Sequence, residues 1–216
     1  QYNAFNHTID RREGYTIFTS DEHHINNDSL LELVKGADAI SLHWTARFLS
    51  FENIAMLSNL GVPVVLTLRD MFYLTGGCHY FHGCKKWQLS CEGCPQLPDE
   101  SVDVAREVFE YKARNWNMEN ITMVVLSDIS KRVAEKSRLF KDVNIVKINN
   151  GFEESYVELK DKATCMNELE LPSDKFLLLY MPSYESKVKG RAEALATLRK
   201  LYKKLGDKLT VVVAGS

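Results

Sequence analysis

Short, β-branched apolar runs alternate with longer helical patterns along this chain, and this alternation limits the possible folds more than any other feature. The runs that we expect to be strands are 15–20, 37–44, 63–68, 121–126, 143–148, 176–181 and 209–214. The helical patterns are 51–60, 101–118, 128–139 and 189–206. Several runs are apolar at nearly every position, as strands buried on both faces are. We therefore predict an α/β fold with parallel sheets and helices on both faces, with ligands beyond the carboxyl ends of the strands.

The chain has 216 residues, enough for one large domain or two small ones. Its net charge of −2 and its pI near 6.3 argue against a nucleic-acid-binding protein, which usually carries a strongly basic face. Its apolar runs are too short to cross a bilayer. The chain starts without an initiator methionine, and no helix follows its last strand, so we interpret it as a piece of a longer protein.

A loop at residues 74–97, "LTGGCHYFHGCKKWQLSCEGCPQL", holds four of the five cysteines: Cys78, Cys84, Cys91 and Cys94. The last two form a C-x2-C knuckle, a common half-site for tetrahedral zinc. The first two can supply the other thiolates, and nearby glycines allow tight turns around an ion. Such a four-thiolate zinc site would be structural, because it leaves no coordination position for water or substrate.

The same four cysteines are also compatible with disulfides, with redox chemistry or with unlinked thiols. Disulfides need an oxidising compartment and would leave Cys165 as an odd thiol. A redox knuckle normally lies at the N-terminus of a helix and carries a low-pKa thiol at Cys91 or Cys94, whereas here the turn "PQLPDE" follows it. His79 and His82 lie in the same loop, either as substitute ligands or as surface or hydrogen-bonding residues.

The sequence around the cysteines is a more specific family signature than the cysteines alone. The segments "AISLHW", "FLSFENIAML", "GVPVVLTLRDMFYLTGGCHY", "GCKKW" and "CEGCPQL" resemble a group of bacterial retaining glycosyltransferases in the "group 1" family, number four in the usual classification. The segments "VVLSDISKRVAEKS", "INNGFEESY" and "MPSYESKVKGRAEALATLRKL" are similar to later parts of the same family. The resemblance runs from about residue 37 to the end of the chain.

This resemblance implies a GT-B enzyme with two Rossmann-like halves, truncated at both ends. Residues 1–155 would be the acceptor-side domain, 156–174 a linker, and 175–216 the start of the donor-side domain. The family's glycine-rich loop and its later Glu-x7-Glu motif are absent, so the fragment itself is expected to be inactive. The whole enzyme would transfer sugar from a nucleotide-sugar to a glycan or lipid-linked glycan. It would act in surface polysaccharide synthesis in the cytoplasm, at the inner face of the membrane.

The resemblance also assigns residues to the donor side. Lys189 and Gly190 would bind the donor diphosphate at a helix start, where free N–H groups and the helix dipole favour anions. Alternatively, Lys189 is a solvated lysine. Many family members carry a Gly-Arg pair slightly earlier, and this chain has "PSYES" there, with Lys187 nearby.

Arg69 and Asp70 follow strand 63–68 and are the catalytic candidates. Many family members have His-Asp here, and Arg69 cannot shuttle a proton at neutral pH as that histidine could. Alternatively, the two residues form an ion pair that braces the cysteine loop. The residues expected to line the acceptor cleft are His43, Trp44, Ser127, Asn150 and Gly151.

Each acceptor candidate has a chemical reason and a structural alternative. His43 could hydrogen-bond an acceptor hydroxyl and Trp44 could stack on a sugar, or the two could be a packed rim pair. Ser127 is expected to cap helix 128–139. The Asn149-Asn150-Gly151 segment is expected to be a turn with positive φ.

Helix 101–118 carries aromatic and basic side chains that suit either a membrane surface or a packed amphipathic helix: Phe109, Tyr111, Lys112, Arg114 and Trp116. Two functions from other classes remain, a zinc-stapled interaction module and a thiol redox protein. A nucleotide-dependent dehydrogenase is not favoured, because G-x-G-x-x-G follows none of the strands.

Overall fold

The computed structural model describes residues 18–19, 25–98, 103–154, 160–181 and 189–215. The chain divides into two compact units, Gln1–Asn150 and Gly151–Ser216. The strand predicted at 15–20 lies largely outside the described residues. Within it, Phe18 forms an isolated antiparallel bridge with Cys78 of the cysteine loop.

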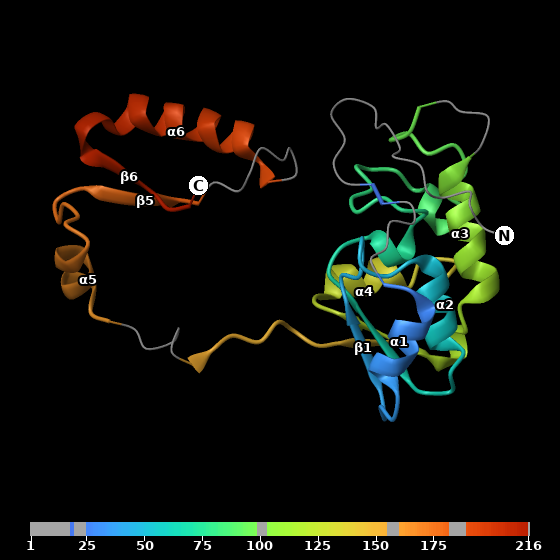
Figure 1. The fold of residues 1–216 in the computed structure, drawn as a ribbon. Coiled ribbons are helices and arrows are strands. Elements are labelled where there is room, and N and C mark those ends of the chain that lie inside the picture. The colour runs from blue at the N-terminus through green and yellow to red at the C-terminus, as the bar shows by residue number, and fades with distance from the viewer. Residues whose placement is uncertain (1–17, 20–24, 99–102, 155–159, 182–188, 216) are drawn as a thin grey trace. The chain divides into compact units, whose positions relative to one another are not determined.

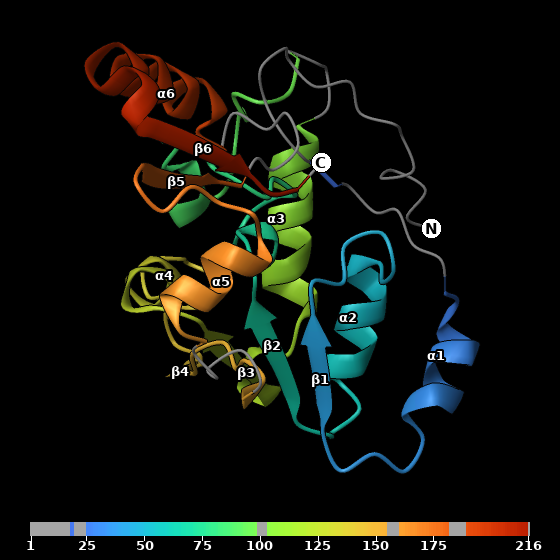
Figure 2. The same cartoon turned by 90° about the vertical axis from the view of Figure 1, so that its left-hand side faces the viewer.

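The first unit is built on a four-stranded, entirely parallel sheet in the order β1-β2-β3-β4. Figure 2 shows the arrows of β1 and β2 side by side in one direction. The strands are β1 (Ile40–His43), β2 (Val64–Leu68), β3 (Ile121–Val125) and β4 (Asn144–Lys147). The helices are α1 (Asn27–Val34), α2 (Phe51–Ser58), α3 (Val104–Asn115) and α4 (Asp128–Ala134), as Figure 1 shows. The predicted Rossmann-like alternation of strands and helices is confirmed, and α1 is an addition to it.

The two faces of this sheet differ in burial. One face presents Leu42, Leu66 and Met123, which are buried in a single core with helix residues such as Ile54 and Phe109. On the opposite face Ser41 and Val146 are exposed and Val65 and Thr122 are half-buried, whereas Thr67 and Val124 are buried. Right-handed crossovers between consecutive neighbouring strands carry their helices to the same face. The prediction of helices on both faces is therefore wrong for the part of the first unit that the structure describes.

The cysteine loop joins β2 to α3 and packs closely against that helix. One short 3-10 turn, Phe72–Leu74, leads into the loop, and a second, Lys86–Gln88, lies within it. Helix α3 begins after Asp103, whose side chain accepts a hydrogen bond from the backbone N–H of Arg106. Many of its bulky side chains point into the core. Those expected to touch a membrane are mostly buried there: Phe109, Tyr111, Lys112 and Trp116. The packed alternative is the correct one for these four residues.

The second unit contains a two-stranded parallel sheet, β5 (Phe176–Tyr180) with β6 (Leu209–Val213). Helix α6 (Arg191–Leu205) connects the strands. Helix α5 (Lys162–Glu168) lies in the segment that the sequence pattern indicated as a linker, and Asp161 caps it. Among the described residues, no helix combines the length and the apolar character that crossing a membrane requires.

Candidate functional site

The carboxyl edge of the four-stranded sheet gathers most of the residues predicted for the acceptor side. Parallel strands end at the same edge, and Trp44, Arg69, Ser127 and Asn150 follow β1, β2, β3 and β4 in turn. Arg69 Nη1 donates a hydrogen bond of 2.6 Å to Asn150 Oδ1. This bond links the segments after β2 and β4 across the end of β3. The sheet thus brings together Arg69 and Asn150, which are 81 positions apart in the chain.

Asp70 is the centre of this edge. Its Oδ2 accepts a 2.7 Å hydrogen bond from the indole Nε1 of Trp44, and its Oδ1 accepts one of 2.9 Å from the backbone N–H of Phe72. His79 Nδ1 also lies 2.7 Å from Oδ2. Asp70 thus uses both oxygens within the protein. The ion-pair alternative for Arg69 and Asp70 does not describe these contacts, because Arg69 binds Asn150 instead.

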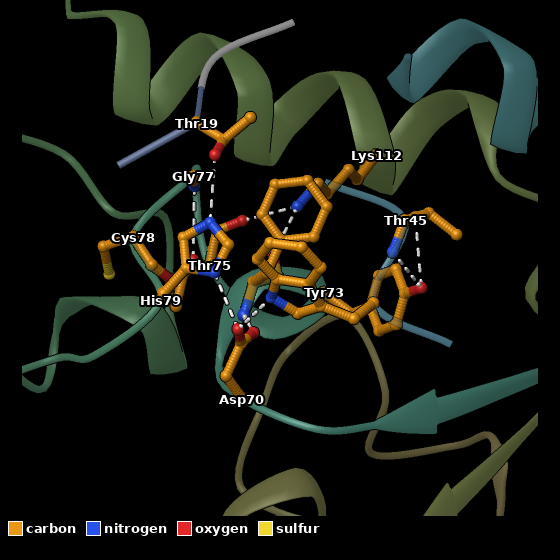
Figure 3. Close-up of polar contacts among 11 residues, drawn as sticks. Thr19, Thr45, Asp70, Tyr73, Thr75, Gly77, Cys78, His79 and Lys112 are labelled. Atoms are coloured by element: carbon orange, nitrogen blue, oxygen red, sulfur yellow. Dashed lines mark hydrogen bonds and ion pairs between the residues drawn. The ribbon is translucent and has the colours of Figure 1, made fainter. Parts of the chain in front are cut away.

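His79 extends the network inward and is fully buried. Because the Asp70 carboxylate can only accept, Nδ1 of His79 is the donor of their bond. Its Nε2 lies 3.0 Å from Thr19 Oγ1, and in the neutral ring this nitrogen accepts from the hydroxyl. Figure 3 shows His79 between Thr19 and Asp70. Of the two alternatives for His79, the hydrogen-bonding one is correct.

The other residues predicted for the acceptor cleft lie outside the hydrogen-bond network of Asp70. His43 Nε2 lies 3.2 Å from Ser41 Oγ at an exposed position. Ser127 caps α4 as predicted, accepting a 3.1 Å hydrogen bond from the N–H of Ser130. The predicted positive-φ turn at Asn150 and Gly151 is wrong, because the positive φ angles of the described residues lie elsewhere. Trp44 does have a positive φ, of 45°.

The donor-side residues belong to the second unit. Gly190 is the N-cap residue of α6, with φ of 67° and no side-chain cap hydrogen bond. Lys189 directly precedes it, so the predicted helix start is confirmed. The "PSYES" stretch and Lys187 lie outside the described residues.

The four loop cysteines are free thiols and form no disulfide. Burial raises the pKa of Cys78 and that of Cys91 each to about 12, and it also raises the pKa of Cys94. The neighbouring thiols raise these values further. A redox catalyst needs the opposite shift, towards a thiolate at neutral pH. These environments therefore do not favour the redox hypothesis.

Two of the loop sulfurs accept hydrogen bonds from the backbone. Backbone N–H groups point at them: that of Gly76 donates to Cys91 Sγ at 3.2 Å and that of Lys86 to Cys84 Sγ at 3.4 Å. Backbone hydrogen bonds also act on Cys94. Four sulfur ligands fit zinc by their chemistry. However, no group of three or more His, Cys, Asp or Glu side chains in the described part of the chain is arranged to hold a metal ion.

Lys112 is a further functional candidate. From the sequence alone, it could also have been part of a membrane-facing surface of its helix. It is fully buried, and its Nζ donates 2.8 Å hydrogen bonds to the carbonyls of Phe72 and Thr75. The ammonium also lies 4.5 Å from the ring centre of Phe51. Lys112 therefore fixes the start of the cysteine loop to α3. The sequence did carry a signal, because Lys112 lies four residues after Val108 on the apolar stripe of the helix.

Tyr73, beside this network, makes stability depend on alkaline pH. Burial raises its pKa from 10.0 to about 12, outweighing the hydrogen bonds with Thr45 that lower it. Above pH 10 the unfolded chain ionises this group before the folded chain does, so stability is lost as pH rises towards 12.

We therefore expect the stability difference between the wild type and Tyr73→Phe to move by about 1.4 kcal/mol against the wild type between about pH 9 and pH 11, so that the variant becomes the more stable protein. Urea unfolding of both proteins at each pH measures it. Near pH 8 the variant should be less stable by about 1 kcal/mol. Phenylalanine lacks the hydroxyl group that forms the 3.1 Å hydrogen bond between Tyr73 and Thr45 Oγ1. A difference that stays constant with pH would contradict the expectation.

The chain was also compared with known proteins. A scan against models of protein families, a search of curated proteins and a search of solved structures each found no match for it.

Proposed function

We propose that this chain is part of a retaining GT-B glycosyltransferase that transfers sugar from a nucleotide-sugar to a glycan or lipid-linked glycan acceptor. The observation that carries the proposal is the row of Trp44, Arg69, Asp70 and Asn150 at the carboxyl edge of a parallel sheet. Ligands of open α/β sheets bind at this edge. An aromatic ring next to a guanidinium and amide groups suits a sugar, which has both an apolar face and hydroxyls. The resemblance described from the sequence supports the same function.

Arg69 and Asp70 would have different tasks in this reaction. Three groups already occupy the oxygens of Asp70, so it would orient its neighbours rather than accept a proton from the acceptor. Arg69 stays charged at neutral pH and would stabilise negative charge that develops on the leaving group or acceptor. Lys189, with the uncapped start of α6, would bind the donor diphosphate.

The cysteine loop would hold a structural zinc ion through Cys78, Cys84, Cys91 and Cys94. The raised pKa values keep Cys78 and Cys91 neutral at physiological pH, so binding a metal there would release protons. The zinc would staple the loop that carries His79, and it would take no part in the chemistry.

The transferase proposal is tested with the natural full-length protein. It is incubated with UDP-, GDP- and ADP-linked sugars and a mixture of bacterial surface glycans, and release of nucleoside diphosphate is measured. We expect Arg69→Ala to lower kcat/KM by about tenfold or more, because a charge-stabilising group is lost. Arg114→Ala, which removes a more remote arginine that donates to the Glu110 carbonyl, is the matched control. If the protein consumed none of these donors, the result would contradict the transferase proposal.

Zinc is tested separately by elemental analysis and thiol counting. We expect about one zinc per chain in the wild type, its loss in Cys84→Ser, and its retention in Cys165→Ser. Chelation should make the four loop thiols reactive. A wild-type protein without metal, whether its thiols titrate freely or not, would contradict the zinc proposal and leave the transferase proposal standing.

A further inference from the structure

We propose that Trp44 is a stacking surface for a pyranose ring, and that a hydrogen-bond chain through Asp70, His79 and Thr19 fixes its orientation. This inference rests on the acceptor role proposed above for the carboxyl edge of the sheet. It adds the mode of recognition, together with two positioning residues, His79 and Thr19, that are remote in sequence from Trp44.

The exposure of Trp44 is the first observation. The chain has three tryptophans, and Trp87 and Trp116 are each only 4% exposed, whereas Trp44 is 45% exposed. Trp44 also adopts a left-handed φ of 45°, and Arg47 in the same loop has φ of 67°. Such angles are uncommon for bulky side chains and persist where the surrounding structure holds them, often at ligand sites.

The second observation is that hydrogen bonds hold the exposed indole ring in place. Its Nε1 donates to Asp70 Oδ2 at 2.7 Å, and His79 Nδ1 donates to the same oxygen at 2.7 Å. Thr19 Oγ1 completes the chain at 3.0 Å from His79 Nε2. His79 and Thr19 are buried, so the bond between them is shielded from water (Figure 3). A ring that is already oriented loses little rotational freedom when a ligand stacks on it.

The use of the indole N–H favours a sugar over a lipid surface. A tryptophan at a membrane interface lies with its apolar body in the bilayer and its polar edge at the headgroups. Here Nε1 is already bonded to Asp70, so the ring offers a ligand its carbon surface. The donor groups of Arg69 and the amide of Asn150 lie at the same edge of the sheet and can meet hydroxyl groups. A carbon face bordered by polar groups matches a pyranose ring.

The three tryptophans make a direct test possible in the intact protein. Because the other two are buried, acrylamide quenching of fluorescence reports mainly on Trp44, and Trp44→Phe verifies that assignment. The probes are the methyl glycosides of glucose, galactose, mannose and N-acetylglucosamine. We expect at least one of them to protect Trp44 from acrylamide and to change its emission. By calorimetry, Trp44→Ala should weaken binding of that glycoside about tenfold or more, whereas Phe48→Ala, an exposed aromatic in the same loop, should not.

The positioning role is tested with Thr19→Val and His79→Ala. Thr19→Val keeps the side-chain shape, so it remains informative if His79→Ala fails to fold. Each folded variant should bind the glycoside about 3- to 10-fold more weakly. Each should also leave Trp44 more mobile in fluorescence anisotropy, a change that a loss of stability elsewhere would not cause.

The outcomes of these experiments distinguish the sugar-stacking surface, the anchoring chain and the transferase proposal from one another. Protection of Trp44 by anionic lipid vesicles and by none of the glycosides would overturn the sugar surface. Equal affinity in Thr19→Val and the wild type would overturn the anchoring chain. Donor turnover without any response of Trp44 would refute this inference alone, whereas glycoside binding without donor turnover would refute only the transferase.

Discussion

Replacing Lys112 by methionine is expected to lower the free energy of unfolding of the first unit by about 3 kcal/mol. Methionine fills most of the space of the lysine but cannot donate to the carbonyls of Phe72 and Thr75, which would remain buried without this partner. The interaction of the ammonium with three aromatic rings would also be lost. Urea unfolding followed by circular dichroism measures the difference.

The control for this variant is Lys35→Met. Lys35 is exposed and has an equally exposed partner, Glu32, at 3.5 Å, a pair worth at most about 0.5 kcal/mol. If Lys112→Met were as stable as this control, the buried ammonium would not hold the cysteine loop to α3.

Gly76→Ala is expected to destabilise the first unit by about 3 kcal/mol or to displace the cysteine loop. A Cβ at this position would lie 1.9 Å from the carbonyl oxygen of Ala105 and 2.8 Å from its Cα. Those are backbone atoms of α3 and cannot move aside without shifting the helix. The same displacement would pull the Gly76 N–H away from Cys91 Sγ.

Gly83→Ala is the matched control in the same loop. An added Cβ there meets no atom within 4 Å, so the cost comes only from its φ of +82° and should be about 1 kcal/mol. Thermal unfolding and the thiol count after metal loading compare the two variants. Equal destabilisation by both would mean that contact between the loop and α3 is not close in solution.

Local patterns in the sequence were enough to place the main elements. The apolar runs predicted β1 to β6 within a few residues, because buried parallel strands need continuous apolar side chains. The cap at Ser127 and the start of α6 at Gly190 were also predictable, since they depend on neighbouring residues. Helices α1 and α5 were missed, although α2 and α4, which also have 8 and 7 residues, were predicted.

The candidate site was only half predictable. Trp44, Arg69 and Asp70 were found because each lies at the carboxyl end of a predicted strand, and parallel strands end together. The partner of the buried His79 could not be found in this way, because Thr19 lies 60 residues before it in the chain. The wrong turn at Asn150 has a related cause, since Asn150 is held by a hydrogen bond from Arg69, which is 81 residues away.

The sequence by itself determined the order of strands and helices, the caps and the cysteine spacing, because these follow from periodicity and from residues close in the chain. Tertiary structure alone decided which face of the sheet is covered, that Lys112 is buried, and that Asp70 joins Trp44 to His79. These features depend on distant segments that meet only after the sheet has formed. A buried charge or hydrogen bond is stabilised by the particular atoms that surround it, and no local pattern specifies them.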